Sequence, residues 1–85
     1  AHAKAFLRVF PDAIDLIVRG LRSGLPVSES LVLVSTEVPE PVGSTFKTIS
    51  NKMKLGVTLE KALQETALEL AMTEFNFFTT CIVLQ

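Results

Sequence analysis

The side chains that could carry out chemistry in this 85-residue chain are few and widely spaced. The one histidine is His2, at the N-terminus, and the one cysteine is Cys81, near the C-terminus. A zinc site needs about four nitrogen or sulfur ligands, so these two residues cannot form one. The four glycines are too scattered to form a phosphate-binding loop. We therefore expect no metal site, no cofactor and no catalytic nucleophile paired with a base.

The nine acidic residues are the remaining candidates for catalysis. General acid–base chemistry needs a titrating group that is held against a substrate, whereas these carboxylates fall on the surfaces and caps of the helices expected below. None of them follows the spacing of a calcium-binding loop. We therefore predict that the protein is not an enzyme and that its binding surfaces carry its function.

Four charged residues near the N-terminus form the first candidate surface. Asp12, Asp15, Arg19 and Arg22 follow one another at intervals of 3, 4 and 3 residues, which places them on one face of a helix. We interpret this face as a candidate docking surface for a partner protein. The alternative is a solvated helix face, on which an Asp15–Arg19 pair contributes about 0.2–0.5 kcal/mol.

A second charged group contains Lys47, Lys52 and Lys54. Lysines next to a membrane contribute about 1 kcal/mol each to binding an anionic lipid surface. We favour the simpler alternative, an ordinary solvated helix face.

The C-terminal segment is apolar around most of the helix that it would form. Phe75, Phe78 and Ile82 share one side of that helix, and we expect them to take part in self-association or to pack into the core. Phe77 and Cys81 share another side with Leu84. We expect Cys81 to behave as a small buried apolar residue.

The elements that position these residues are all helical, because no segment alternates apolar and polar residues as a strand does. We expect helices over residues 10–23, 28–37, 41–55, 59–70 and 73–85. Ser28, Thr58 and Thr73 are the expected N-caps, and Gly24 and Gly56 the expected C-terminal stops. Residues 1–9 are either a helical lead-in, kinked or broken from residues 10–85 at Pro11, or a remnant of cloning.

An internal repeat links two of these turns. The segment GLPVSESL (residues 24–31) aligns with GVTLEKAL (residues 56–63) at an offset of 32 residues. Both read as the end of one helix and the start of the next, so the sequence predicts an all-α, compact bundle of about five short helices built from two helical hairpins. The last helix is either exposed or part of a contact between chains.

Composition narrows the function further. The net charge is −1, which gives no electrostatic footprint for nucleic acid, and 48% of the residues are hydrophobic. The longest weakly charged stretch, residues 75–85, is shorter than the roughly 20 apolar residues of a membrane-spanning helix. The first residues lack the apolar core of a signal peptide.

The same residues carry a resemblance to a known family. The segments FPDAIDLIVRGLRSGLPVSESL (residues 10–31), VPEPVG (residues 38–43), LGVTLEKAL (residues 55–63) and residues 77–85 resemble the type II secretion system F domain, and most closely its branch in Tad pilus assembly. Each segment alone is common in helical proteins, but their shared order over residues 10–85 is specific.

The resemblance implies a role as an assembly platform. Members of the family are bacterial inner-membrane proteins with a helical domain on the cytoplasmic side, and they connect pilin subunits to a secretion ATPase. It implies as partners that ATPase, a related platform protein and further copies of the chain, with the membrane reached through segments outside these 85 residues. It also implies that residues 10–85 stop before the last helix of the domain.

One alternative remains, a small helix-turn-helix module that binds DNA, because a short turn at Gly24 joins two helices. A recognition helix exposes Arg, Lys, Asn or Gln near its N-terminus. The second helix offers Ser28, Glu29 and Ser30 there, so we favour the platform.

Overall fold

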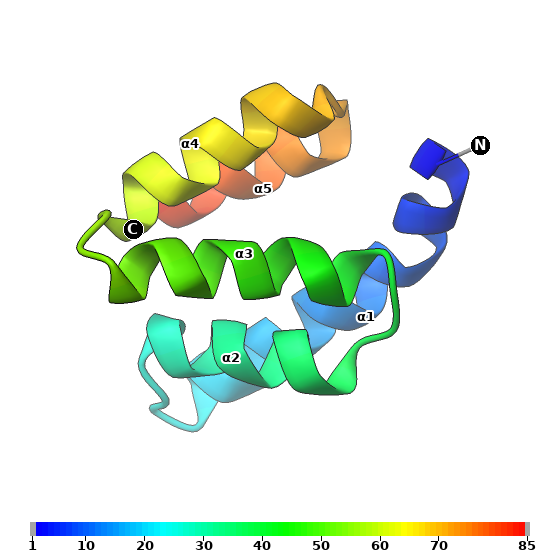
Figure 1. The fold of residues 1–85 in the computed structure, drawn as a ribbon. Coiled ribbons are helices and arrows are strands. Elements are labelled where there is room, and N and C mark those ends of the chain that lie inside the picture. Colours follow the sequence, from blue (N-terminus) through cyan, green and yellow to red (C-terminus); the bar gives the residue numbers. More distant parts are fainter. Residues whose placement is uncertain (1, 85) are drawn as a thin grey trace.

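The structure is a computed structural model that describes residues 2–84. Within these residues it contains helices and no strands (Figure 1). The helices are α1 (His2–Arg22), α2 (Val27–Glu37), α3 (Val42–Lys54), α4 (Leu59–Leu70) and α5 (Thr73–Val83). This confirms the predicted all-α bundle. No helix among the described residues combines the length and the apolar character that crossing a membrane requires.

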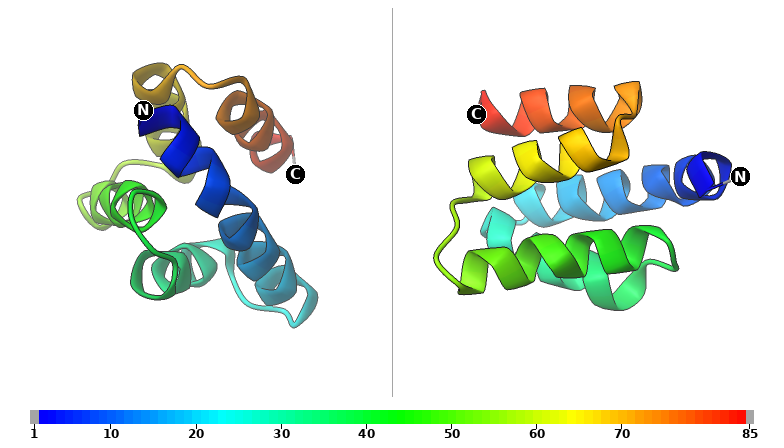
Figure 2. Two further views of the ribbon diagram at one scale, coloured as in Figure 1. Left: turned by 90° about the vertical axis from the view of Figure 1, so that its right-hand side faces the viewer. Right: turned by 45° about the horizontal axis from the view of Figure 1, so that its top comes forward.

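Each helix packs against the helix that precedes it in the chain, and α3 lies in the middle of the bundle. The α4–α5 pair covers one side of α3, and the α1–α2 pair covers the other (Figures 1 and 2). Helices α1 and α5 come from opposite ends of the chain, and they run in the same direction across the bundle (Figure 1). This arrangement leaves the α1 and α5 surfaces next to each other.

An aromatic cluster forms the centre of the core and joins three helices. Phe6 and Phe10 of α1, Phe46 of α3, and Phe75 and Phe78 of α5 have ring centroids 5.3–6.2 Å apart. Most of these pairs are tilted or edge-to-face, which is the favoured geometry for aromatic rings. The long separation in sequence between α1 and α5 means that these rings hold the two ends of the chain together.

The N-terminal lead-in is helical and belongs to the same core. Helix α1 continues through Pro11 and does not break there, although Pro11 cannot donate a hydrogen bond to the carbonyl one turn earlier. Pro11 lies on the exposed side of the helix, while Phe6 is completely buried. Burial of Phe6 and Phe10 before the proline, and of Ala13 and Ile17 after it, stabilises the helix across the missing bond.

The two predicted glycine stops are confirmed. Gly24 and Gly56 have φ angles of +88° and +102°, a left-handed conformation that glycine adopts without strain. At both turns the residue after the glycine donates its backbone N–H to a carbonyl five residues earlier, over 2.9 Å from Leu25 to Gly20 and 3.0 Å from Val57 to Lys52. The repeat in the sequence thus corresponds to two similar helix ends.

Of the three predicted N-caps, one is confirmed and two are wrong. The Thr58 hydroxyl accepts a hydrogen bond of 3.2 Å from the Lys61 backbone N–H. Ser28 lies inside the first turn of α2, which begins one residue earlier, after Pro26. Thr73 is the first residue of α5, after Met72. Neither of these helices has a side-chain cap, because residues with no suitable hydroxyl occupy the two cap positions.

Candidate interaction surfaces

The described residues contain no cluster of three or more His, Cys, Asp or Glu side chains that could hold a metal ion.

The carboxyl group of Glu40 has a lowered pKa. The Ser44 hydroxyl and the Ser44 backbone N–H both donate hydrogen bonds to Glu40, and these bonds lower the pKa of the Glu40 carboxyl below its ordinary value of 4.5. Glu40 is exposed just before α3, so the pair acts as a cap for that helix.

The charged face predicted on α1 is present and exposed. All four of its residues, Asp12, Asp15, Arg19 and Arg22, are open to solvent. The Arg19 Nη2 and Asp15 Oδ2 atoms are 2.9 Å apart in an ion pair between residues one helical turn apart. On the opposite side of α1, Ala13 and Ile17 are buried in the core, so the charged face is held in a fixed position. Docking of a partner protein on this face stays a prediction.

The three α5 residues predicted for self-association lie mainly inside the domain. Phe75 is completely buried, Phe78 is nearly so, and Ile82 packs at the edge of the core. Phe75 and Phe78 therefore contribute mainly to the core, while self-association through these residues stays a prediction. The aromatic residue of α5 that faces solvent is Phe77, with 71% of its surface exposed. Phe77 is therefore the exposed aromatic residue of α5.

A continuous apolar hollow runs between α1 and α5, beside Phe77. Its deeper part has a volume of about 220 Å³ and lies between α1 and α5. It is lined by Ile14, Ile17, Val18 and Leu21 of α1 and by Glu74, Phe77, Phe78, Cys81 and Ile82 of α5. A shallower part continues along Leu7 and Pro11 of α1. Glu74 is the one charged residue that lines either part.

Two expectations from the sequence change because of this hollow. Cys81 is exposed and lines the hollow, so the prediction that it is buried is wrong. Val18 is partly exposed, although its spacing relative to Ile14, Ile17 and Leu21 places it on the apolar side of α1.

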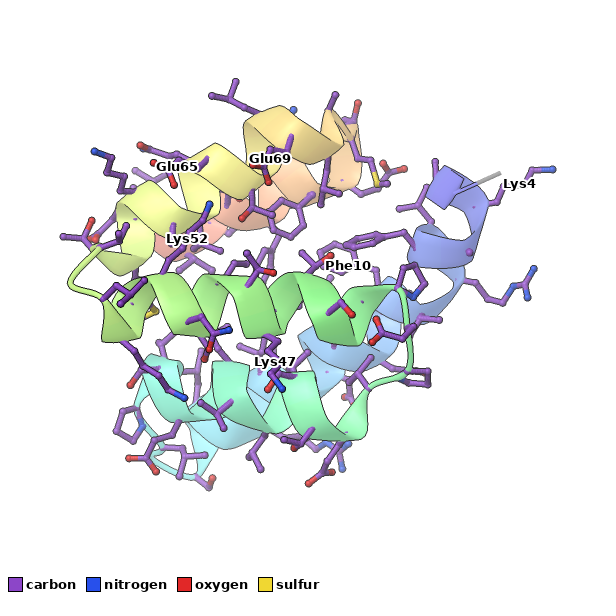
Figure 3. The ribbon with its side chains drawn as sticks, in the orientation of Figure 1. Lys4, Phe10, Lys47, Lys52, Glu65 and Glu69 are labelled. Atoms are coloured by element: carbon purple, nitrogen blue, oxygen red, sulfur yellow. The ribbon has the colours of Figure 1, made fainter. Side chains whose placement is uncertain are left out.

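The lysine group is split between two environments. The Lys52 Nζ and Glu65 Oε1 atoms are 3.0 Å apart, in an ion pair that joins α3 to α4 (Figure 3). Lys47 and Lys54 are exposed. Lys52 is therefore part of the contact between helices, which leaves two separate lysines on the surface of α3.

Helix α2 does not look like a DNA-recognition helix. Its exposed residues in the first turn are Ser28 and Glu29, and it has no basic residue in its last turn. A recognition helix presents basic or amide side chains to base edges. The structure therefore gives no support to the alternative of DNA binding.

These features define a small helical domain with an exposed charged face and an apolar hollow. The model of the type II secretion system protein F family matches residues 13–84. The chain therefore belongs to that family, whose members are non-enzymatic components of secretion and pilus assembly platforms associated with membranes. Searches of curated proteins and of solved structures found no significant match.

Proposed function

We propose that this chain is the cytoplasmic domain of an inner-membrane assembly platform, and that it couples a secretion ATPase to the assembly of pilin subunits. The family match over residues 13–84 is the observation that carries this proposal. The order of the segments FPDAIDLIVRGLRSGLPVSESL, VPEPVG and LGVTLEKAL supports a place close to TadB, the Tad pilus assembly protein.

The architecture suits the transmission of force through packed helices. The aromatic cluster packs α1 against α3 and α5, so a force applied to α1 acts on the packed core and not on a loop. Protein interiors are close-packed and resist compression, which makes a bundle of this kind a stiff connector.

The exposed charges on α1 are the part of the surface best suited to an ATPase. Charged residues across an interface set its specificity and its association rate, and they bind without forming or breaking covalent bonds. The face carries both signs, so a partner with a matching pattern of charges is required. We place the docking contact on Asp12, Asp15, Arg19 and Arg22, because their spacing puts them on one exposed face of α1.

Binding to the cognate secretion ATPase tests the proposal. A double charge reversal, Asp12→Lys with Arg19→Glu, keeps the net charge of the chain and should weaken binding by at least about 10-fold at low salt. The matched control is Glu60→Lys with Lys61→Glu, two exposed neighbours on α4, which should leave binding unchanged. Equal binding by both variants would refute the α1 contact, and no binding by the wild-type chain would refute the coupling to the ATPase.

A further inference from the structure

A small pocket between α3 and α4, which we call the α3–α4 pocket, is lined mainly by residues with side-chain oxygen atoms. It has a volume of about 170 Å³, and its lining residues are Ser44, Thr45, Thr48, Thr66, Glu69 and Leu70. Four of these six residues carry a hydroxyl group, one carries a carboxylate, and none carries a side-chain N–H. The pocket shares no residue with the charged face of α1 or with the hollow between α1 and α5.

The four hydroxyl groups can only accept hydrogen bonds from a ligand, because each already donates its single proton within the chain. Thr45, Thr48 and Thr66 donate to the backbone carbonyl four residues earlier, over 3.3, 3.1 and 2.9 Å. The Ser44 hydroxyl donates to the Glu40 carboxylate. A hydroxyl oxygen keeps its lone pairs when it donates. The pocket therefore offers acceptors without donors, which suits a ligand group that has donors and no acceptors.

The carboxylate in the pocket is not paired with a cation of the described residues. Helices α3 and α4 are antiparallel (Figure 1), and Lys52 of α3 pairs with Glu65 of α4 over 3.0 Å. One helical turn further along the same boundary, the corresponding residues are Thr48 and Glu69, and both line the pocket. Figure 3 shows Glu65 and Glu69 along α4, with Lys52 below Glu65. Glu69 forms no ion pair within residues 2–84, so it lies beside hydroxyl groups where Glu65 has a lysine.

Two further charges give the pocket a negative potential. Leu70 is the last residue of α4, so the pocket lies at the C-terminal end of that helix, where the exposed carbonyls carry partial negative charge. Glu40 is hydrogen-bonded to Ser44, and its lowered pKa keeps that carboxyl ionised at neutral pH. Glu40 also accepts the Ser44 backbone N–H, which offsets the positive end of α3. All these groups favour a cation in the pocket.

We propose that the α3–α4 pocket binds the guanidinium group of an arginine side chain from a partner protein. A guanidinium is always positively charged, has five N–H donors and no acceptor, and pairs with a carboxylate through two parallel hydrogen bonds. A lysine ammonium has three donors and lacks this planar geometry. The volume favours one side chain over a complete small molecule, because small-molecule pockets usually measure about 300–1,000 Å³.

The proposal does not depend on the platform role, because it is tested on the purified chain with no ATPase present. The probe is a pentapeptide with one arginine between alanines, blocked at both ends, and carbon-13 NMR follows the threonine methyl groups. The signals of Thr45, Thr48 and Thr66 should shift saturably, with a dissociation constant on the order of 1–10 mM for a single side chain. The same peptide with citrulline keeps the shape and loses the charge, and it should bind at least about 10-fold more weakly.

Two substitutions test the pocket itself. Glu69→Gln keeps the shape of the side chain and removes its charge, and it should weaken binding at least about 5-fold. Thr48→Val removes one acceptor and should weaken binding about 2- to 10-fold. The matched control is Glu60→Gln, an exposed carboxylate in the first turn of α4 that does not line the pocket, and it should leave binding unchanged. Glu69 and Thr48 are exposed, so both variants should stay folded, as circular dichroism melting measures.

The proposal is wrong if the three methyl signals show no saturable shift with the arginine peptide. Equal binding of the citrulline peptide would refute recognition of the charge, and tighter binding of the matching lysine peptide would refute the choice of a guanidinium. The same shifts with sodium or potassium chloride at equal ionic strength would assign the pocket to a small cation. Binding of free arginine amide without binding of the peptide would assign it to a small molecule. Equal binding by Glu69→Gln and Glu60→Gln would place the contact elsewhere.

Discussion

The Ser30 hydroxyl of α2 lies directly against Gly20 of α1. A methyl group added at Gly20 would overlap the Ser30 Oγ atom, so the two helices can approach as they do only because residue 20 has no side chain. Both residues are buried, and the Ser30 Oγ atom has no hydrogen-bond partner within the described part of the chain. The contact between α1 and α2 thus depends on two small residues, one of which carries an unsatisfied polar atom.

This contact predicts a non-additive pair of substitutions. Gly20→Ala should lower the free energy of unfolding by about 1–3 kcal/mol, because the added methyl group meets Ser30. Ser30→Ala should change it by less than about 0.5 kcal/mol, since no hydrogen bond is lost. The double variant should be more stable than the wild type by up to about 1 kcal/mol, because alanine favours a helix more than glycine does. Urea denaturation measures the free energy of unfolding of all three variants. If the effects of the two single substitutions simply add in the double variant, the close contact between residues 20 and 30 is contradicted.

The cap of α4 gives a second prediction. Thr58→Ala removes the hydroxyl that accepts a hydrogen bond from the Lys61 backbone, and it should lower the free energy of unfolding by about 1 kcal/mol. Ser28→Ala and Thr73→Ala are matched controls, because these hydroxyls cap no helix, and each should cost less than about 0.5 kcal/mol. Thermal melting of the three variants separates the cap from the controls. If Ser28→Ala lowers the free energy of unfolding as much as Thr58→Ala does, the Ser28 hydroxyl caps α2.

The internal repeat contained the information that would have corrected the wrong prediction of Ser28 as an N-cap. In the alignment at an offset of 32 residues, Thr58 stands opposite Pro26 rather than Ser28. The structure places both Thr58 and Pro26 at the residue before the first helical residue. The side-chain preference for serine at a cap was a weaker guide than the position of the preceding glycine, because the left-handed glycine turn fixes where the next helix begins.

The fold was easier to predict than the surface. Glycine stops and apolar spacing are local signals, so they identified five helices and their turns from neighbouring residues alone. Which side of α5 meets the core depends on packing against α1 and α3, which lie far away in sequence. Phe75 and Phe77 look alike in the sequence, yet one is in the centre of the core and the other is in solvent. The different burial of Phe75 and Phe77 therefore became visible only when the helices were placed together.

The start of α3 should respond to acid. Hydrogen bonds from the Ser44 hydroxyl and backbone hold the pKa of Glu40 below 4.5, so the capping contact stabilises the fold at higher pH and is lost as the pH falls through the lowered pKa. Ser44→Ala removes the hydroxyl donor and should raise the pKa of Glu40 toward 4.5. Carbon-13 NMR of the side-chain carboxyl measures this titration. An unchanged Glu40 titration in Ser44→Ala would show that the hydroxyl does not bind the carboxylate in solution.

The two phenylalanines of α5 should differ sharply in their effect on stability. Phe75→Ala opens a cavity inside the aromatic cluster and should lower the free energy of unfolding by about 3–5 kcal/mol, a large part of the stability of a domain of this size. Phe77→Ala should cost less than about 1 kcal/mol, because its ring is mostly in solvent. Urea denaturation of the two variants measures both losses. A loss in Phe77→Ala as large as that in Phe75→Ala would mean that the Phe77 ring belongs to the core.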